Sequence, residues 1–207
     1  MNSDVMTKSV PVARPSFGPE EEKAVVEVLR SGWVSQGPRV AEFEKRFADF
    51  VGAREAIAVS SCTTALHLAL VAAGVQPGDE VLCPSLSFIA TANAIVYTGA
   101  KPVFVDIDPF TFNIDPKHLE SSITPKTKAI LVVHQIGLPC ALREISEIAS
   151  RHNLIVVEDA ACARAELDYG RGSAWADAGG GEDTEQAPGG NGHDREERRR
   201  RGDGDVR

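Results

Sequence analysis

The 207-residue sequence lacks the motifs and segments that mark several common protein classes. It has no G-x-G-x-x-G sequence after an apolar run and no Walker-type loop ending in Gly-Lys-Ser or Gly-Lys-Thr, which disfavours the usual dinucleotide and nucleoside triphosphate enzymes. No apolar run approaches the roughly 20 residues that span a membrane. Residues 1–16 have no apolar centre of the kind found in signal peptides. We therefore expect a cytoplasmic protein that does not insert into membranes.

Cysteine is scarce, and positive charge is outnumbered by negative charge. The four cysteines, Cys62, Cys83, Cys140 and Cys162, form no CxxC pair and have no metal-ligand spacing with the five histidines. We expect reduced, small packed side chains and no metal site. A net charge of -8 at pH 7 argues against a nucleic-acid-binding surface, whereas the 43% apolar content is enough for a core.

Lysine is absent from residues 164–207, which hold eight Arg, 11 acids and 10 of the 18 glycines. Such a segment cannot bury enough apolar surface to offset the entropy lost on ordering. We expect it to be a disordered tail and residues 1–14 to be a flexible N-terminus. The abrupt change after residue 163 is typical of a GC-rich gene read out of frame; a genuine disordered tail and an Arg-rich arm for nucleic acid at Arg198–Arg201 are alternatives.

The middle of the chain has the pattern of an α/β protein. Residues 15–32 and a stretch with Val40, Phe43, Phe47 and Phe50 at spacings of three and four predict two amphipathic helices. Short, almost continuously apolar runs then alternate with helical stretches, which favours a mostly parallel sheet covered by helices on both faces. The predicted strands are 55–61, 80–84, 101–106, 128–134 and 153–159, and the predicted helices are 63–74, 88–99 and 142–152.

Three features lie where such a sheet binds ligands, at the carboxyl ends of its strands. Residues 60–64 place small hydroxyl side chains at a helix start, which suits a phosphate or is an ordinary helix cap. Phe88 follows a strand and is able to stack on a planar ring or to pack in the core. Asp159 ends an apolar strand, where it is able to hold a pyridine nitrogen protonated or to be a solvated strand end. Glu158 points to the opposite face, and His134 ends a strand facing the same crevice or is simply packed.

Several consecutive blocks resemble the DegT-type nucleotide-sugar aminotransferase family, whose members have the type I fold of pyridoxal-phosphate (PLP) enzymes. The resemblance runs from about residue 15 to residue 163 and keeps the order and spacing of the family's blocks. The blocks are SGWVSQGPRVAEFEKRFADFVG, AVSSCTTALHLAL, GDEVLCPSLSFIATANAI, GAKPVFVDID, ITPKTKAILVVH and VVEDAACA.

The resemblance implies a role for five residues. Cys62 and Thr63 match the position whose amides and hydroxyl bind the cofactor phosphate, and Phe88 matches the aromatic that stacks on the ring. Asp159 matches the carboxylate that pairs with the pyridine nitrogen. Cys162 lies where many members carry Gln or His beside the ring's 3-hydroxyl. The chain then corresponds to part of the PLP-binding large domain, without the small C-terminal domain.

In the family the chain continues to a lysine that holds PLP covalently, whereas the last lysine of this sequence is Lys128. No residue is therefore assigned a catalytic role, and we expect a truncated, inactive homologue. The resemblance implies that the intact parent is a homodimer that transfers an amino group, from a donor such as glutamate, to a keto-sugar nucleotide. The alternatives are the family's dehydratase branch, with a histidine such as His193 in place of the lysine, and a non-catalytic module that binds PLP or a partner.

Overall fold

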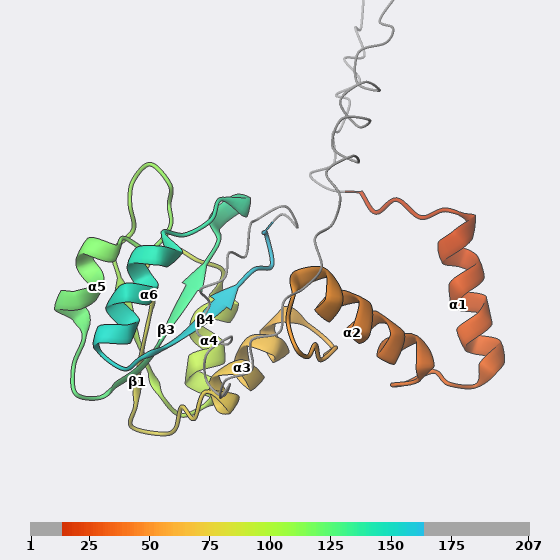
Figure 1. The fold of residues 1–207 in the computed structure, drawn as a ribbon, viewed down its shortest axis with the longest axis horizontal. Coiled ribbons are helices and arrows are strands. Elements are labelled where there is room, and N and C mark those ends of the chain that lie inside the picture. The colour runs from red at the N-terminus through yellow and green to blue at the C-terminus, as the bar shows by residue number, and fades with distance from the viewer. Residues whose placement is uncertain (1–13, 164–207) are drawn as a thin grey trace, which may run out of the picture. The chain divides into compact units, whose positions relative to one another are not determined.

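The computed structural model of the protein describes residues 14–163, so the expectations for the N-terminus and for the tail after residue 163 lie outside the described residues (Figure 1). Parallel strands and helices alternate over most of this part, as the sequence predicts. The elements are α1 (Pro19–Ser31), α2 (Pro38–Val51), α3 (Cys62–Ala72), β1 (Glu80–Pro84), α4 (Ile89–Tyr97), β2 (Lys101–Val105), α5 (Pro116–Ser122), β3 (Thr127–Val133), the 3-10 turn η1 (Gln135–Gly137), α6 (Leu142–Arg151) and β4 (Ile155–Asp159).

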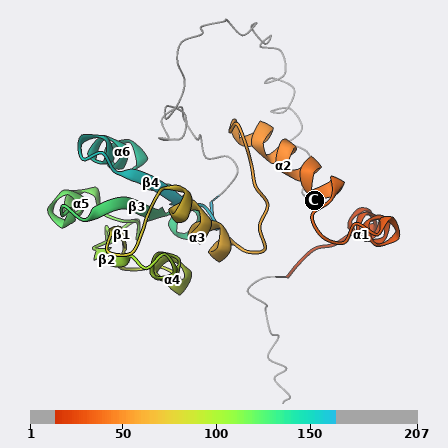
Figure 2. The same ribbon diagram turned by 90° about the horizontal axis from the view of Figure 1, so that it is seen from below.

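The four strands form one parallel sheet in the order β2-β1-β3-β4. Helices α3 and α4 lie on one side of it, and α5 and α6 lie on the other (Figure 2). The predicted α/β class, with helices on both faces of a parallel sheet, is confirmed. Because crossover helices cover both faces, β1 and β3 are buried on both sides, which explains their nearly continuous apolar sequences.

Two apolar cores, one on each face, hold the sheet and its helices together. Successive side chains of a strand point to opposite faces, so Val156 joins the core under α5 and α6 while Val157 joins the core under α3 and α4. The same alternation decides the surroundings of the last two residues of β4, Glu158 and Asp159. The first core includes Leu66, Leu70, Val81, Ile95 and Leu131, and the second includes Leu82, Leu119, Ile130, Val132, Ile145 and Ile148.

The strand predicted for residues 55–61 does not form within residues 14–163. The backbone there is outside the sheet, and the Ile57 side chain is 79% exposed. The Ala58 N–H donates to the Glu44 carboxylate at 2.8 Å instead of to a neighbouring strand. An apolar, β-branched segment needs a strand beside it, and no segment of the described part supplies one.

Helix boundaries differ from the predicted ones for local reasons. The first helix begins at Pro19 rather than at residue 15, with Gly18 as its N-cap. Proline is favoured at the first helical position, because the N–H that it lacks would have no partner within the helix. Helix α5 was not predicted. Its sequence signal is the Asp-Pro pair, in which the Asp115 carboxylate accepts a hydrogen bond from the Lys117 N–H at 3.0 Å and Pro116 begins the helix.

Helices α1 and α2 form as the sequence predicts, but their apolar faces stay open. Helix α1 has no buried residue, and Ala48 is the one buried residue of α2. The phenylalanines of the predicted α2 stripe, Phe43, Phe47 and Phe50, are all exposed. Within residues 14–163 no helix is both long and apolar enough to cross a membrane.

Candidate functional site

The candidate site lies at the carboxyl edge of the sheet, where segments far apart in the sequence meet. Strands β1, β3 and β4 end at Pro84, Val133 and Asp159, and the last two of these residues are paired in register. Helix α3 begins at Cys62 and joins this edge through a contact between Cys62 and Asp159. Ligand sites of open parallel sheets occupy this position.

Asp159 is a buried carboxylate with one oxygen in use. Its side chain is on the α3 and α4 face, and the residue is only 7% exposed. Oδ1 accepts hydrogen bonds from the Ala161 N–H at 3.1 Å and from the Cys62 thiol at 3.6 Å. No described residue donates to Oδ2, and none forms a salt bridge with Asp159. No buried side-chain oxygen of the described residues lacks a hydrogen-bond partner, so Oδ2 reaches solvent at the surface of the site. It is therefore available to a cationic N–H of a ligand.

The start of α3 presents backbone donors that have no acceptor in the protein. Ser61 caps the helix, because its Oγ accepts from the Thr64 N–H at 3.2 Å. No described residue accepts from the N–H groups of Cys62 and Thr63. Free amides at the positive end of an 11-residue helix favour an anion such as phosphate. The helix cap is confirmed, and it leaves the amides that a phosphate would bind unused, so the two alternatives from the sequence do not exclude each other.

Cys62 links this turn to the carboxylate. Cys62 is exposed as a residue, but partial burial of its thiol raises the thiol pKa. The nearby negative charge of Asp159 and the hydrogen bond to it raise this pKa further. The side chain is therefore a protonated donor rather than a nucleophilic thiolate. Because Cys62 begins α3 and its thiol contacts Asp159, the free amides of α3 and Oδ2 of Asp159 lie at the same end of the sheet.

Phe88 and Cys162 are accessible at the same edge, but no hydrogen bond joins them to the other candidate residues within the described part. Phe88 follows β1 and precedes α4, and it is 77% exposed. The alternative that Phe88 packs in the core is therefore wrong. Cys162 is exposed in the turn after β4, and Cys62 is exposed as well. The expectation of packed cysteines therefore holds for Cys83 and Cys140 but is wrong for these two.

His134 does not face the crevice of Asp159, so of the alternatives from the sequence the packed histidine is confirmed and the crevice-facing one is wrong. It is 1% exposed and lies on the α5 and α6 face, where its Nε2 is 3.2 Å from the Glu158 Oε2. Its Nδ1 accepts a hydrogen bond from the Cys140 N–H at 3.1 Å. Strand alternation accounts for the difference, because His134 is one residue beyond Val133 and Glu158 is one residue before Asp159. Sequence reasoning missed the bond between these two side chains.

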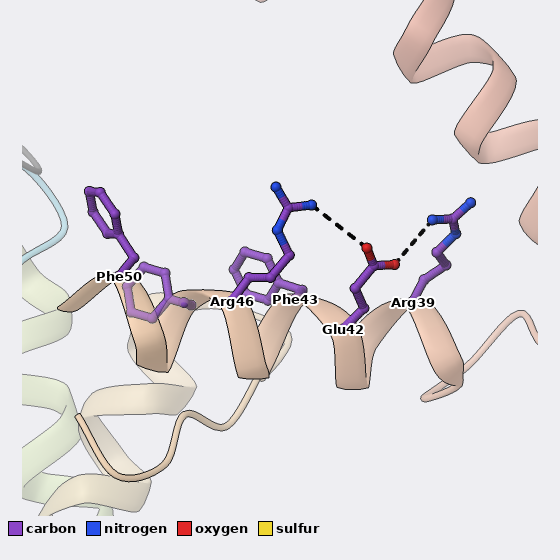
Figure 3. Close-up of a pocket in the computed structure, with 6 residues that line it drawn as sticks. Arg39, Glu42, Phe43, Arg46 and Phe50 are labelled. Atoms are coloured by element: carbon purple, nitrogen blue, oxygen red, sulfur yellow. Dashed lines mark hydrogen bonds and ion pairs between the residues drawn. The ribbon is translucent and has the colours of Figure 1, made fainter. Parts of the chain in front are cut away.

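A concavity of about 440 Å³ lies elsewhere, along α2. Figure 3 shows that it is an open surface between side chains of one helix, with Glu42 bonded to Arg39 and Arg46. None of the candidate cofactor residues lines it, and its one carboxylate, Glu42, is paired with the two arginines of its lining. Its remaining lining residues are Phe43, Phe47 and Phe50. We regard it as part of the uncovered apolar face of α2 rather than as a ligand site.

Comparisons with known proteins bear on the same residues. Residues 15–178 match the DegT/DnrJ/EryC1/StrS aminotransferase family, a match that continues past residue 163 into residues outside the described part. The chain is 54% identical over 152 residues to the spore coat polysaccharide biosynthesis protein SpsC of Bacillus subtilis, covering 73% of this chain and 39% of that protein. It is 53% identical over 153 residues to the GDP-perosamine synthase of Caulobacter vibrioides, covering 73% and 41%.

A solved structure supports the fold assignment. The crystal structure of ntda from Bacillus subtilis with bound cofactor pmp superposes with a TM-score of 0.71 at 42% sequence identity, covering 73% of this chain and 35% of that one. The chain thus spans about two fifths of the length of the curated relatives that it matches.

Proposed function

The chain belongs to the DegT/DnrJ/EryC1/StrS aminotransferase family, and on that basis we propose that residues 15–163 are the PLP-binding portion of a sugar aminotransferase. The whole protein would transfer an amino group, from a donor such as glutamate, to a keto-sugar nucleotide. The observation that carries the proposal is the link between the free amides of α3 and the buried carboxylate of Asp159, made by Cys62. A site for a phosphate-bearing pyridine ring requires donors for the phosphate and an acceptor for the protonated ring nitrogen. The amides of α3 and the carboxylate of Asp159 are suited to these two tasks, and Cys62 joins them.

The residues present fit PLP, which supplies an electron sink when it is bound. The N–H groups of Cys62 and Thr63, with the Thr63 hydroxyl, would bind the phosphate. Asp159 would accept a hydrogen bond from the ring nitrogen at Oδ2 and keep that nitrogen protonated. The exposed side chain of Phe88 would cover one face of the ring, and Cys162 would lie near the 3-hydroxyl in place of a polar residue.

The proposal for this chain is non-covalent binding of the cofactor. No lysine follows Lys128, so no residue of the sequence matches the lysine that holds PLP covalently in the family. We expect borohydride treatment of the protein with PLP to label no single dominant lysine, as judged by peptide mapping. One strongly labelled lysine would show that another side chain has taken that position.

The direct test is a titration of the 207-residue chain with pyridoxamine phosphate, followed by fluorescence. Asp159→Ala should weaken binding by roughly 10- to 150-fold, the equivalent of losing one charged hydrogen bond of about 1.5–3 kcal/mol. The matched control is Asp49→Ala, which removes an exposed carboxylate on α2 and should leave the Kd unchanged. An equal Kd for Asp159→Ala and the unmodified chain would contradict the proposed function.

A further inference from the structure

A buried histidine, His134, contacts both of the last two residues of β4, Glu158 and Asp159. The His134 backbone N–H donates to the Asp159 carbonyl at 3.1 Å. Its side chain, through Nε2, contacts the carboxylate of Glu158 at 3.2 Å. The residue is 1% exposed, so its polar atoms depend on these partners rather than on water.

The hydrogen-bond pattern fixes the tautomer of the ring. Nδ1 accepts from the Cys140 N–H, so it carries no hydrogen, and the ring proton resides on Nε2. Nε2 therefore donates to the Glu158 carboxylate. Both nitrogens are in use, which sets the orientation of the ring and leaves Glu158 directed toward the α5 and α6 face.

The loop that follows His134 is held in a conformation that it would not adopt alone. Ile136 has φ 53 and ψ 26, a left-handed conformation that is unfavourable for a β-branched residue. The buried Asn113 clamps this loop. Its side-chain N–H groups donate to the carbonyls of Leu138 and Pro139, both at 3.0 Å, and its Oδ1 accepts from the Gln135 N–H at 2.9 Å.

This loop also reaches the segment that carries Phe88. The Gln135 side-chain amide donates to the backbone carbonyl of Leu86, two residues before Phe88. The loop is therefore hydrogen-bonded to the segment that carries Phe88, and His134 at its start is hydrogen-bonded to the strand that carries Asp159. His134 stands at the junction, bonded to β4 on one side and, through Cys140, to the end of the loop on the other.

We infer that His134 is a positioning residue of the cofactor site, and that with Glu158 it directs the Asp159 carboxylate toward α3. The physical reason is strand alternation: holding Glu158 on one face of the sheet keeps its neighbour Asp159 on the other. His134 itself touches no cofactor. The inference rests on the proposed function for its ligand, but the placement of Asp159 is measurable without any ligand.

Two readouts on the full 207-residue chain test it. The first is the affinity for pyridoxamine phosphate of His134→Leu, Glu158→Leu and Glu158→Gln. The two leucine variants should bind at least severalfold more weakly, whereas Glu158→Gln should bind normally, because its amide oxygen still accepts from Nε2. In an Asp159→Asn background, His134→Leu should weaken binding little further, since the two residues act through the same carboxylate.

The second readout needs no cofactor and is the rate at which a disulfide reagent modifies Cys62, assigned by peptide mapping. The Asp159 carboxylate raises the pKa of the Cys62 thiol, so moving that carboxylate away should lower this pKa and speed the reaction. Both leucine variants should react severalfold faster, approaching the rate of Asp159→Asn, and Glu158→Gln should react at the original rate. Glu158→Leu covers the case in which His134→Leu does not fold.

Unchanged Cys62 reactivity in a folded leucine variant would overturn the inference, as would losses of affinity that add fully to that of Asp159→Asn. If the unmodified chain binds no pyridoxamine phosphate, the proposed function fails while the Cys62 rates still decide whether His134 positions Asp159.

Discussion

The sheet and the first two helices of the same chain differ sharply in how far they bury their apolar residues. The central strands β1 and β3 are almost wholly buried between two layers of helices, whereas α1 buries no residue and α2 buries one. Both regions have apolar residues at the spacing that their secondary structure requires. Periodicity therefore determines which face of an element is apolar, but it does not determine what covers that face.

Helices α4, α5 and α6 connect the strands of the sheet and pack on strands that they connect. Helix α3 precedes β1 and contacts β4, which is distant in the chain. Within residues 14–163, no element covers the apolar faces of α1 and α2 or the exposed segment around Ile57. Large exposed apolar surfaces on a protein mark contact sites. The faces of α1 and α2 that carry these side chains are therefore candidate surfaces for contact with another molecule.

The largest effect that separates the two regions should come from the same substitution made in each. Leu131→Ala in the core under α3 and α4 should lower the free energy of unfolding by about 2–5 kcal/mol, because it leaves a cavity. Leu29→Ala on α1, where the side chain is 63% exposed, should change it by no more than about 0.5 kcal/mol. Urea denaturation measures both. Equal losses would mean that α1 is covered in solution.

A second expected effect concerns association through α2. We expect the chain to self-associate as its concentration rises, because Phe43 and Phe47 offer apolar surface to another molecule. The double substitution Phe43→Lys and Phe47→Lys should shift the mass measured by light scattering toward that of a monomer. Lys45→Ala, on the same helix, should leave it unchanged. If the unmodified chain stays monomeric at every concentration, the apolar face of α2 does not mediate self-association.

A smaller effect should appear at the edge of the sheet. The rate of Cys62 modification should rise with pH, and Asp159→Asn should move that rise to lower pH, because removing a neighbouring negative charge favours the thiolate. The pKa should stay above the ordinary thiol value, since burial remains its largest cause. A shift to higher pH would mean that the carboxylate does not face the thiol.

The smallest effect is expected from the ion pairs of the helices. Arg39 contacts the carboxylates of Glu27 and Glu42 at 2.7 and 3.1 Å, but all three side chains are about half exposed. Water and salt screen such pairs. Arg39→Ala should therefore leave the denaturation midpoint unchanged within error. A clear loss would indicate that α1 and α2 are shielded from solvent.

The sequence predicted the features that depend on local pattern. The strands ending at Pro84 and Asp159 were placed correctly, because a strand buried on both faces has an unmistakably apolar run. Alternation along β4 also separated Asp159 from Glu158 correctly. The roles proposed for Cys62, Thr63, Phe88, Asp159 and Cys162 remain predictions.

What the sequence did not predict depends on contacts between distant residues. The apolar segment around Ile57 has a strand's pattern, but a strand forms only beside another. His134 could not be assigned a partner from the sequence. Its partner Glu158 is 24 residues away, and the two meet only because β3 and β4 pair in parallel. The conformation of Ile136 likewise follows from the Asn113 clamp rather than from its own preference.

The most direct test of the cofactor site is a crystal structure of the 207-residue chain with pyridoxamine phosphate. The phosphate should accept hydrogen bonds from the N–H groups of Cys62 and Thr63, and the ring nitrogen should donate to Oδ2 of Asp159. A ligand bound elsewhere, such as along the α2 surface of Figure 3, or one whose ring nitrogen points away from Asp159, would contradict the proposed cofactor site.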